Sequence, residues 1–172
     1  TRLVSDWSSD VCSSDLADSG AAISGRPGAI VCGGDDYPPG FAAVVSALAR
    51  QLDCPLLAEP LSNLRFGGHD RRRICVRYDA FLRPPSPLAA ARPEWLLRCG
   101  SFPVTRTLQD WLHANRTARH IVLGADSRWR DPLHCAAAVI QGDPLAVCED
   151  WLATPLRPAA PRWREKIGRA HV

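Results

Sequence analysis

Short apolar runs alternate along the chain with segments in which apolar residues recur every three or four positions. Five of these runs have the length of a strand, and each contains a glycine or a proline or ends beside one. They occupy residues 28–34, 55–60, 95–99, 120–126 and 136–141. Runs that are apolar throughout, without polar alternation, are typical of strands buried on both faces of a parallel sheet.

Helical spacing of apolar residues is found at residues 40–52, 104–114 and 145–152. Asp143 and Pro144 precede the last segment as a predicted N-cap and first helical residue. Residues 74–82 are consistent with a further short helix. This alternation predicts an α/β fold, a Rossmann-like three-layer parallel sheet of about five strands. The first strand is expected in the centre, with the second on one side and the third to fifth on the other.

The two ends of the chain differ from the middle in composition. Residues 1–16 contain the near-repeat SSDVCSSD and no apolar periodicity, and residues 166–172 contain the only lysine, Lys166. Both ends resemble translated sequencing-adapter DNA, so we expect them to be foreign tails that are disordered or loosely attached. The sequence therefore predicts one central α/β domain at residues 17–155 and a proline-rich linker at 156–165. We also expect this body to be a fragment of a longer protein.

Composition and charge narrow the class of protein further. The chain has 172 residues, of which 46% are hydrophobic and 23% charged, as in an ordinary soluble domain. The formal net charge of +3 is too small to indicate a nucleic-acid partner, and no apolar run reaches the length of a membrane span. The cysteines are scattered without a CxxC pair, which argues against a zinc or dithiol site and fits the reducing cytoplasm.

The glycine pair Gly33 and Gly34 follows the first predicted strand, where dinucleotide-binding folds keep their phosphate loop. The patterns GxGxxG and GxxxxGK(S/T) are absent, and Asp35 and Asp36 place two carboxylates where a pyrophosphate would lie. A plain turn from strand to helix is therefore the better interpretation. The histidines show no metal-ligand spacing and no serine lies in a nucleophile-elbow motif, so we assign no catalytic, cofactor-binding or metal-binding residue.

Arg106 is the residue that we single out as a candidate ligand contact. It lies where residues 95–111 pass from the third predicted strand through a small-residue turn into a helix, and α/β sheets bind ligands at such junctions. An arginine there can hold a carboxylate with two parallel hydrogen bonds, but Asp110 at i+4 offers it an equally good surface partner. Arg98 is a second anomaly, because a cation within an apolar strand needs a carboxylate, which we expect on a neighbouring strand.

Four segments together carry a resemblance to a known family. Their sequences are PLLAEPLSNLRFG (55–67), RYDAFLR (77–83), WLLRCGSFPVTRTLQDW (95–111) and SRWRDP (127–132). In this order and at this spacing they resemble the central domain of the 2-succinyl-5-enolpyruvyl-6-hydroxy-3-cyclohexene-1-carboxylate (SEPHCHC) synthases, which are thiamine-diphosphate-dependent enzymes of menaquinone biosynthesis. The resemblance covers nearly all of residues 17–152.

The resemblance implies a full-length homodimer or homotetramer with a pyrimidine-binding, a central and a pyrophosphate-binding domain. Such an enzyme uses thiamine diphosphate and Mg²⁺ to decarboxylate 2-oxoglutarate and adds the succinyl unit to isochorismate. The cofactor-binding motifs belong to the missing N- and C-terminal domains, so the fragment alone is expected to bind no cofactor and to be inactive. Arg106 falls where the family has a lysine, in a segment similar to PVSK that reads PVTR here, which implies a contact with a substrate carboxylate.

Two other interpretations stay open at this point. The first is a non-catalytic Rossmann-like module that binds an anionic metabolite through Arg65, Arg77 or Arg106. The second is the central domain of another thiamine-diphosphate enzyme, such as a relative of the acetolactate synthases. The segments PLSNLRFG and PVTR argue against the second interpretation.

Overall fold

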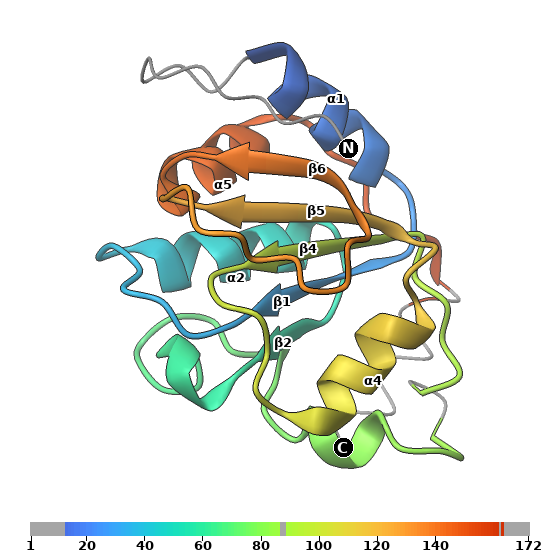
Figure 1. Cartoon of the computed structure of the whole chain (residues 1–172). Helices are drawn as coiled ribbons and strands as arrows, with labels where there is room; N and C mark the ends of the chain where they lie inside the picture. The colour runs from blue at the N-terminus through green and yellow to red at the C-terminus, as the bar shows by residue number, and fades with distance from the viewer. Residues whose placement is uncertain (1–12, 87–88, 162, 164–172) are drawn as a thin grey trace.

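Six strands form one parallel sheet in the computed structural model, which describes residues 13–86, 89–161 and 163 (Figure 1). The strands are β1 (Gly28–Cys32), β2 (Leu56–Ala58), β3 (Ile74–Cys75), β4 (Trp95–Cys99), β5 (Arg119–Gly124) and β6 (Ala136–Gln141). Their order in the sheet is β3-β2-β1-β4-β5-β6, and every adjacent pair is parallel. β1 thus has β2 and β3 on one side and β4 to β6 on the other, which confirms the predicted fold class and strand order.

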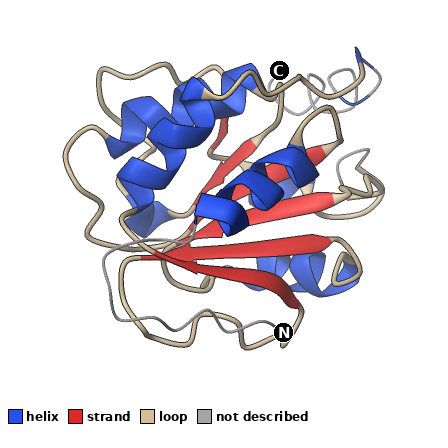
Figure 2. Ribbon diagram, turned by 90° about the horizontal axis from the view of Figure 1, so that it is seen from above, coloured by secondary structure: helices blue, strands red, loops and turns tan. Residues whose placement is uncertain are grey.

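Helices cover both faces of the sheet and give the molecule three layers (Figure 2). The α-helices are α1 (Ser13–Ile23), α2 (Phe41–Gln51), α3 (Tyr78–Phe81), α4 (Arg106–Ala114) and α5 (Pro144–Ala153), and a short 3₁₀ helix, η1, spans Pro60–Ser62. One face packs against α1, α2 and α5, and the other packs against α3 and α4. The predicted cap of α5 is confirmed, because Oδ1 of Asp143 accepts the Leu145 N–H at 3.0 Å.

The apolar run of β4 shows why the strands lack polar alternation. Trp95, Leu97 and Cys99 belong to the core beneath α2 and α5, whereas Leu96 belongs to the core beneath α4. Since both faces are covered, an apolar side chain is favoured at each position, and a large one stabilises the fold by roughly 1.5–3 kcal/mol. Arg98 is the exception, and the alternation places it on the α4 face.

A sixth strand and α3 replace the single short helix that the sequence predicts over residues 74–82. Ile74 and Cys75 pair in parallel with Leu56 and Leu57, and the helix begins only at Tyr78. A strand of two residues is too short to show a period of its own, so the helical spacing beside it dominates the pattern. The sheet therefore has six strands where the sequence predicts about five.

The predicted N-terminal tail is partly built into the domain. α1 begins at Ser13, so the expected border after residue 16 lies inside this helix. Leu16 packs against the core, and its carbonyl accepts a hydrogen bond of 3.0 Å from the indole N–H of Trp151. The expectation of a loose tail is thereby corrected for residues 13–16, and residues 1–12 lie outside the described part of the chain.

The described part of the proline-rich segment after α5 has no regular secondary structure up to residue 160, and it makes contacts with the domain. The Ala159 N–H donates to the Leu52 carbonyl at 3.1 Å. Trp163 is buried, and its indole N–H donates to the Gly28 carbonyl at 3.1 Å. Apolar residues between and after the prolines thus join the core, beyond the expected end of the domain at residue 155. The expected foreign tail at 166–172 lies outside the described residues.

Arg98 finds its carboxylate in a loop and not on the neighbouring strand where we expected it. Its Nη2 lies 2.5 Å from Oδ1 of Asp131, in the irregular connection between β5 and β6. Oδ2 of the same carboxylate accepts the backbone N–H groups of Cys135 and Ala136 at 2.8 and 2.7 Å. The connection crosses the sheet (Figure 1), and Asp131, which is 1% exposed, holds it against the α4 face.

Opposing effects act on the pKa of Asp131. Burial alone raises this pKa, but the hydrogen bonds from Ala136, Arg98 and Cys135 and the charge of Arg98 outweigh burial and hold the pKa below its ordinary value. A depressed pKa in the folded state means that the carboxylate stabilises the fold above the pKa of the unfolded chain, which is about 4. This stability is lost as the pH falls through the lower, folded-state pKa.

We predict that Asp131→Asn lowers the free energy of unfolding by about 3 kcal/mol at neutral pH, because the buried Arg98 guanidinium loses its counter-charge. Urea unfolding followed by tryptophan fluorescence measures the loss. The difference between the variant and the unchanged protein should shrink as the pH falls below about 4. Asp36→Asn, at an exposed carboxylate, is the control, and a difference that does not depend on pH would contradict the argument.

Candidate functional site

The connections that follow β1, β2, β4 and β5 all leave the sheet at its carboxyl-terminal edge, because the strands are parallel. The order of the strands reverses between β1 and β4, and open α/β sheets bind ligands outside the strand ends at such a point. Gly33 and Gly34 follow β1 there, and Gly100 and Ser101 follow β4. A ligand can bind at this position only if there is enough space between these two turns.

The two turns at the reversal point are in direct contact. The Gly33 N–H donates to the Cys99 carbonyl at 2.9 Å, and the Ser101 N–H donates to the Gly34 carbonyl at 3.0 Å. A Cβ on Gly33 would lie 1.9 Å from the Ser101 carbonyl oxygen. Backbones this close leave no room for a diphosphate, and Asp35 adds a carboxylate beside them. The space beside Gly33 is thus filled by backbone, and the plain strand-to-helix turn stays a prediction.

A second part of this edge lies at the junction of β4 and α4. α4 begins at Arg106, which confirms the predicted position of this residue in the first helical turn. Leu108, Trp111 and Leu112 are buried on the face of α4 that packs against the sheet. Gln109 supports the turn before the helix, because its Nε2 donates to the Pro103 carbonyl at 2.8 Å.

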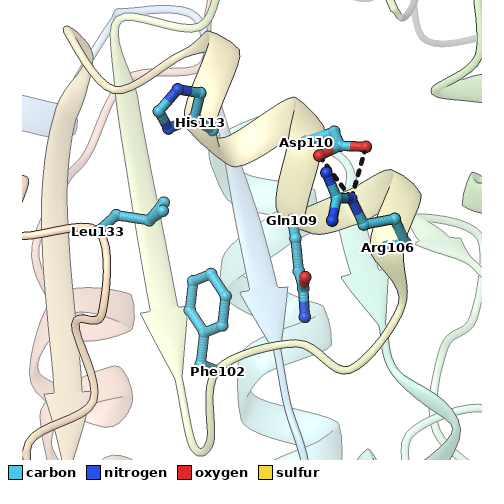
Figure 3. A pocket seen from close by; sticks show the side chains of 6 residues that line it. All are labelled: Phe102, Arg106, Gln109, Asp110, His113 and Leu133. Carbon is cyan, nitrogen blue, oxygen red and sulfur yellow. Dashed lines mark hydrogen bonds and ion pairs between the residues drawn. The ribbon is translucent and has the colours of Figure 1, made fainter.

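A groove of about 300 Å³ lies along α4 and is lined by Phe102, Arg106, Gln109, Asp110, His113 and Leu133 (Figure 3). The polar side chains project from α4, whereas Phe102 comes from the turn after β4 and Leu133 from the β5–β6 connection. A guanidinium and an amide beside an aromatic ring and an aliphatic side chain can hold the charged end and the apolar body of a small organic acid.

Arg106 takes the partner at i+4 that the sequence offers. Its Nε lies 2.9 and 3.0 Å from the two carboxylate oxygens of Asp110, and both side chains are exposed. The bond raises the pKa of Arg106 further, so the guanidinium stays charged at physiological pH. An exposed ion pair of this kind is weak, and another carboxylate can readily replace Asp110 as the partner of Arg106. The pair confirms the structural interpretation of Arg106, and its contact with a ligand carboxylate stays a prediction.

The other two arginines considered as anion contacts lie in different surroundings. Arg65 donates from Nε to the Ala58 carbonyl at 2.9 Å, and its guanidinium carbon lies 5.8 Å from the ring centre of Tyr78. Arg77 is exposed at the N-cap position of α3. Arg65 is thus used inside the fold, whereas Arg77 and Arg106 face solvent from two different helices.

A buried carboxylate beside the junction receives no role in the sequence prediction. Glu59, which follows β2, is 1% exposed and accepts the Tyr78 hydroxyl at 2.5 Å and the Val104 N–H at 3.3 Å. Oγ1 of Thr105 lies 3.0 Å from the same hydroxyl. Burial, followed by the bond to Glu59, raises the pKa of Tyr78 to about 12. The one sequence signal is a glutamate directly after a buried strand, and this signal does not reveal its partners.

Within residues 13–86, 89–161 and 163, no group of three or more His, Cys, Asp or Glu side chains is placed to hold a metal ion. Cys32, Cys54, Cys99, Cys135 and Cys148 are free thiols. None of its helices is long and apolar enough to cross a membrane.

Several curated relatives of the chain share one name. The chain is 40% identical over 154 residues to the 2-succinyl-5-enolpyruvyl-6-hydroxy-3-cyclohexene-1-carboxylate synthase of Dechloromonas aromatica. It is 42% identical over 127 residues to that of Geobacillus thermodenitrificans and 44% identical over 125 residues to that of Geobacillus kaustophilus. These matches cover 90%, 74% and 73% of this chain but 28%, 21% and 21% of the relatives. The chain is thus homologous to part of these synthases and spans about a quarter of their length.

A solved structure shows the same fold, although no family model matches the sequence. It is a candidate thiamin diphosphate-dependent enzyme from Mycobacterium smegmatis, with a TM-score of 0.51 and 15% sequence identity. The match covers 87% of this chain and 29% of that chain. At this identity the likeness concerns the fold alone, and it agrees with the predicted α/β class.

The contact between the two turns at the reversal point can be tested by substitution. We predict that Gly33→Ala lowers the free energy of unfolding by about 1–3 kcal/mol, because the added methyl group meets the Ser101 carbonyl oxygen. Gly68→Ala is the matched control, since a Cβ at Gly68 has no neighbour within 4 Å. Thermal unfolding followed by circular dichroism compares the two variants, and equal stability would show that the turns are not in contact.

Proposed function

We propose that this chain is the central-domain segment of a longer SEPHCHC synthase. In this proposal the longer protein decarboxylates 2-oxoglutarate with thiamine diphosphate and Mg²⁺ and adds the succinyl unit to isochorismate. The observation that carries the proposal is the 40% identity over 90% of the chain to a synthase of which the chain spans 28%. The two Geobacillus synthases support it independently.

The cofactor belongs, in this proposal, to the other parts of the longer protein. The turns after β1 and β4 are hydrogen-bonded to each other, so the position that holds a phosphate group in many α/β folds is filled by backbone. We therefore propose that the 172-residue chain alone binds no thiamine diphosphate and is inactive. The intact protein is proposed to be a cytoplasmic homodimer or homotetramer that contains N- and C-terminal thiamine-diphosphate domains.

The proposed role of Arg106 is to hold a substrate carboxylate in the groove along α4. Both substrates of the proposed reaction carry carboxylates, and a guanidinium binds such a group through two parallel hydrogen bonds. The substrate carboxylate takes the place of Asp110 on Arg106, and Phe102 offers an apolar surface to the body of the substrate. The weakness of the exposed Arg106–Asp110 pair makes this exchange possible.

The alternatives have less support. A stand-alone module for an anionic metabolite needs cations that converge, but Arg65 is already used by the Ala58 carbonyl and by the ring of Tyr78, and Arg77 and Arg106 lie on two different helices. The central domain of a different thiamine-diphosphate enzyme is disfavoured because the curated relatives named above are all SEPHCHC synthases.

Isothermal titration calorimetry tests the proposal that the cofactor binds to other parts of the longer protein and not to this chain. We predict that thiamine diphosphate gives no heat of binding with the 172-residue chain, with or without Mg²⁺, because the turn at Gly33 has no room for a diphosphate. A circular-dichroism spectrum with both helix and sheet signals confirms that the sample is folded. Magnesium-dependent binding of the cofactor to the folded chain would contradict the proposal.

Replacement of Arg106 tests the substrate contact in the longer protein. We predict that Arg106→Ala raises the KM for one of the two substrates about tenfold or more, the scale of a lost hydrogen bond to a charged group. Arg106→Lys should keep part of the affinity, because it keeps the charge. Arg83→Ala is the matched control, since Arg83 is also exposed and paired with an aspartate four residues away. Unchanged kinetics in Arg106→Ala would remove this residue from the site.

A further inference from the structure

A buried series of hydrogen bonds supports the turn from which Arg106 projects. Oε1 of Glu59 accepts the Tyr78 hydroxyl at 2.5 Å, and Oε2 accepts the Val104 N–H at 3.3 Å. Oγ1 of Thr105 lies 3.0 Å from the Tyr78 oxygen. Val104 and Thr105 immediately precede Arg106, so three separate elements, the end of β2, α3 and the start of α4, are joined at this turn.

The direction of each hydrogen bond follows from the available protons. The Tyr78 hydroxyl has a single proton, and it is donated to Oε1 of Glu59. Thr105 must then donate its own proton to the Tyr78 oxygen. The bonds run in one direction, from Thr105 through Tyr78 to Glu59, and each bond in such a series polarises and strengthens the next.

Thr105 does not fill the usual role of its position. It is the N-cap of α4, where a threonine hydroxyl normally accepts a backbone N–H of the first turn, but it makes no side-chain cap bond. Its hydroxyl is bonded to Tyr78 instead. The first turn of α4 is therefore held by a tertiary contact and not by its own cap.

The acceptor at the other end of the series is rigid. The Glu59 N–H donates to the Cys32 carbonyl of the central strand at 3.0 Å. The Glu59 carbonyl accepts the Ser62 hydroxyl at 2.7 Å, within the short η1 segment. The Glu59 backbone is thus held by hydrogen bonds at its N–H and at its carbonyl, so the carboxylate has a defined position beside the turn before α4.

We infer that Glu59, through Tyr78 and through the Val104 N–H, is a positioning residue that fixes the turn between β4 and α4 and thereby orients Arg106. The inference rests on the function proposed for Arg106. Glu59 forms no ion pair within the described residues, and a buried carboxylate without a cation is costly. Among the described residues, this carboxylate forms its side-chain hydrogen bonds with Tyr78 and Val104, so its effect is concentrated on one turn.

Substitutions of Thr105 separate the hydrogen bond from the shape of the side chain. Thr105→Val keeps the shape and removes the donor, whereas Thr105→Ser keeps the donor. In the 172-residue chain we expect the Val104 amide to exchange its proton about tenfold faster in Thr105→Val and in Glu59→Gln, and at a nearly unchanged rate in Thr105→Ser. Nuclear magnetic resonance measures these rates, and Glu94→Gln, at an exposed carboxylate, is the control. Unchanged exchange in both Thr105→Val and Glu59→Gln would overturn the inference.

Kinetics of the longer protein distinguish positioning from a purely structural role. Glu59→Gln and Thr105→Val should raise the same KM as Arg106→Ala, by roughly three- to tenfold, with little change in kcat. In an Arg106→Ala background they should raise it no further, because they act through that side chain. An increase that adds to the effect of Arg106→Ala would assign Glu59 a structural role only.

The two proposals fail in different ways. If Arg106→Ala leaves both KM values unchanged, the function proposed for Arg106 is wrong. If Arg106→Ala raises a KM while Glu59→Gln and Thr105→Val do not, the function stands and the positioning role of Glu59 is wrong. Thr105→Val keeps the test decisive if Glu59→Gln fails to fold, because it leaves the buried carboxylate and its backbone contacts in place.

Discussion

A carboxylate that is taken out of water must be satisfied by hydrogen-bond donors, and this constraint places the irregular parts of the chain. Asp131 accepts from Arg98 and from two backbone N–H groups, and so holds the β5–β6 connection on the α4 face. Glu59 accepts from Tyr78 and Val104, and so holds the turn before α4. The groove lies between these two segments, so its shape depends on two buried carboxylates that do not line it.

The parallel topology brings the loops to one edge, but close packing decides which part of this edge stays open. The strand order reverses between β1 and β4, where a Rossmann-like sheet commonly binds its ligand. Here the turns at Gly33 and Ser101 touch, and the position is closed. Open space remains beside α4, where Phe102 and Leu133 face the helix across the groove (Figure 3). The architecture is thus retained while the space at the reversal point is filled, which is why fold class alone does not assign the function.

The elements that bury many apolar residues could be predicted from the sequence, because β4 is a continuous apolar run and α4 carries a helical period. β3 could not, since two residues show no period and pair only because β2 lies beside them. Arg98 is a second example. A cation within an apolar strand predicts that a carboxylate partner exists, but not that the partner, Asp131, lies 33 residues away in an irregular loop. The hydrogen bond between Glu59 and Tyr78 joins residues that are 19 positions apart in the sequence, and no local sequence pattern indicates it. Long-range polar contacts are therefore the part of this site that only the structure reveals.

The exposure of Arg106 defines what this chain can contribute to the proposed site. Its side chain is 84% exposed, and water competes effectively for a carboxylate bound to an exposed guanidinium. In the proposed enzyme the contribution of this chain is the orientation of the Arg106 guanidinium. Arginine makes that orientation important. A lysine ammonium attracts a carboxylate as a point charge, whereas a guanidinium binds it in one plane, so the proposed contact depends on the direction in which Arg106 leaves the backbone. The buried hydrogen bonds from Tyr78 and from the Val104 N–H to Glu59 restrict the backbone directly before Arg106 and so set this direction.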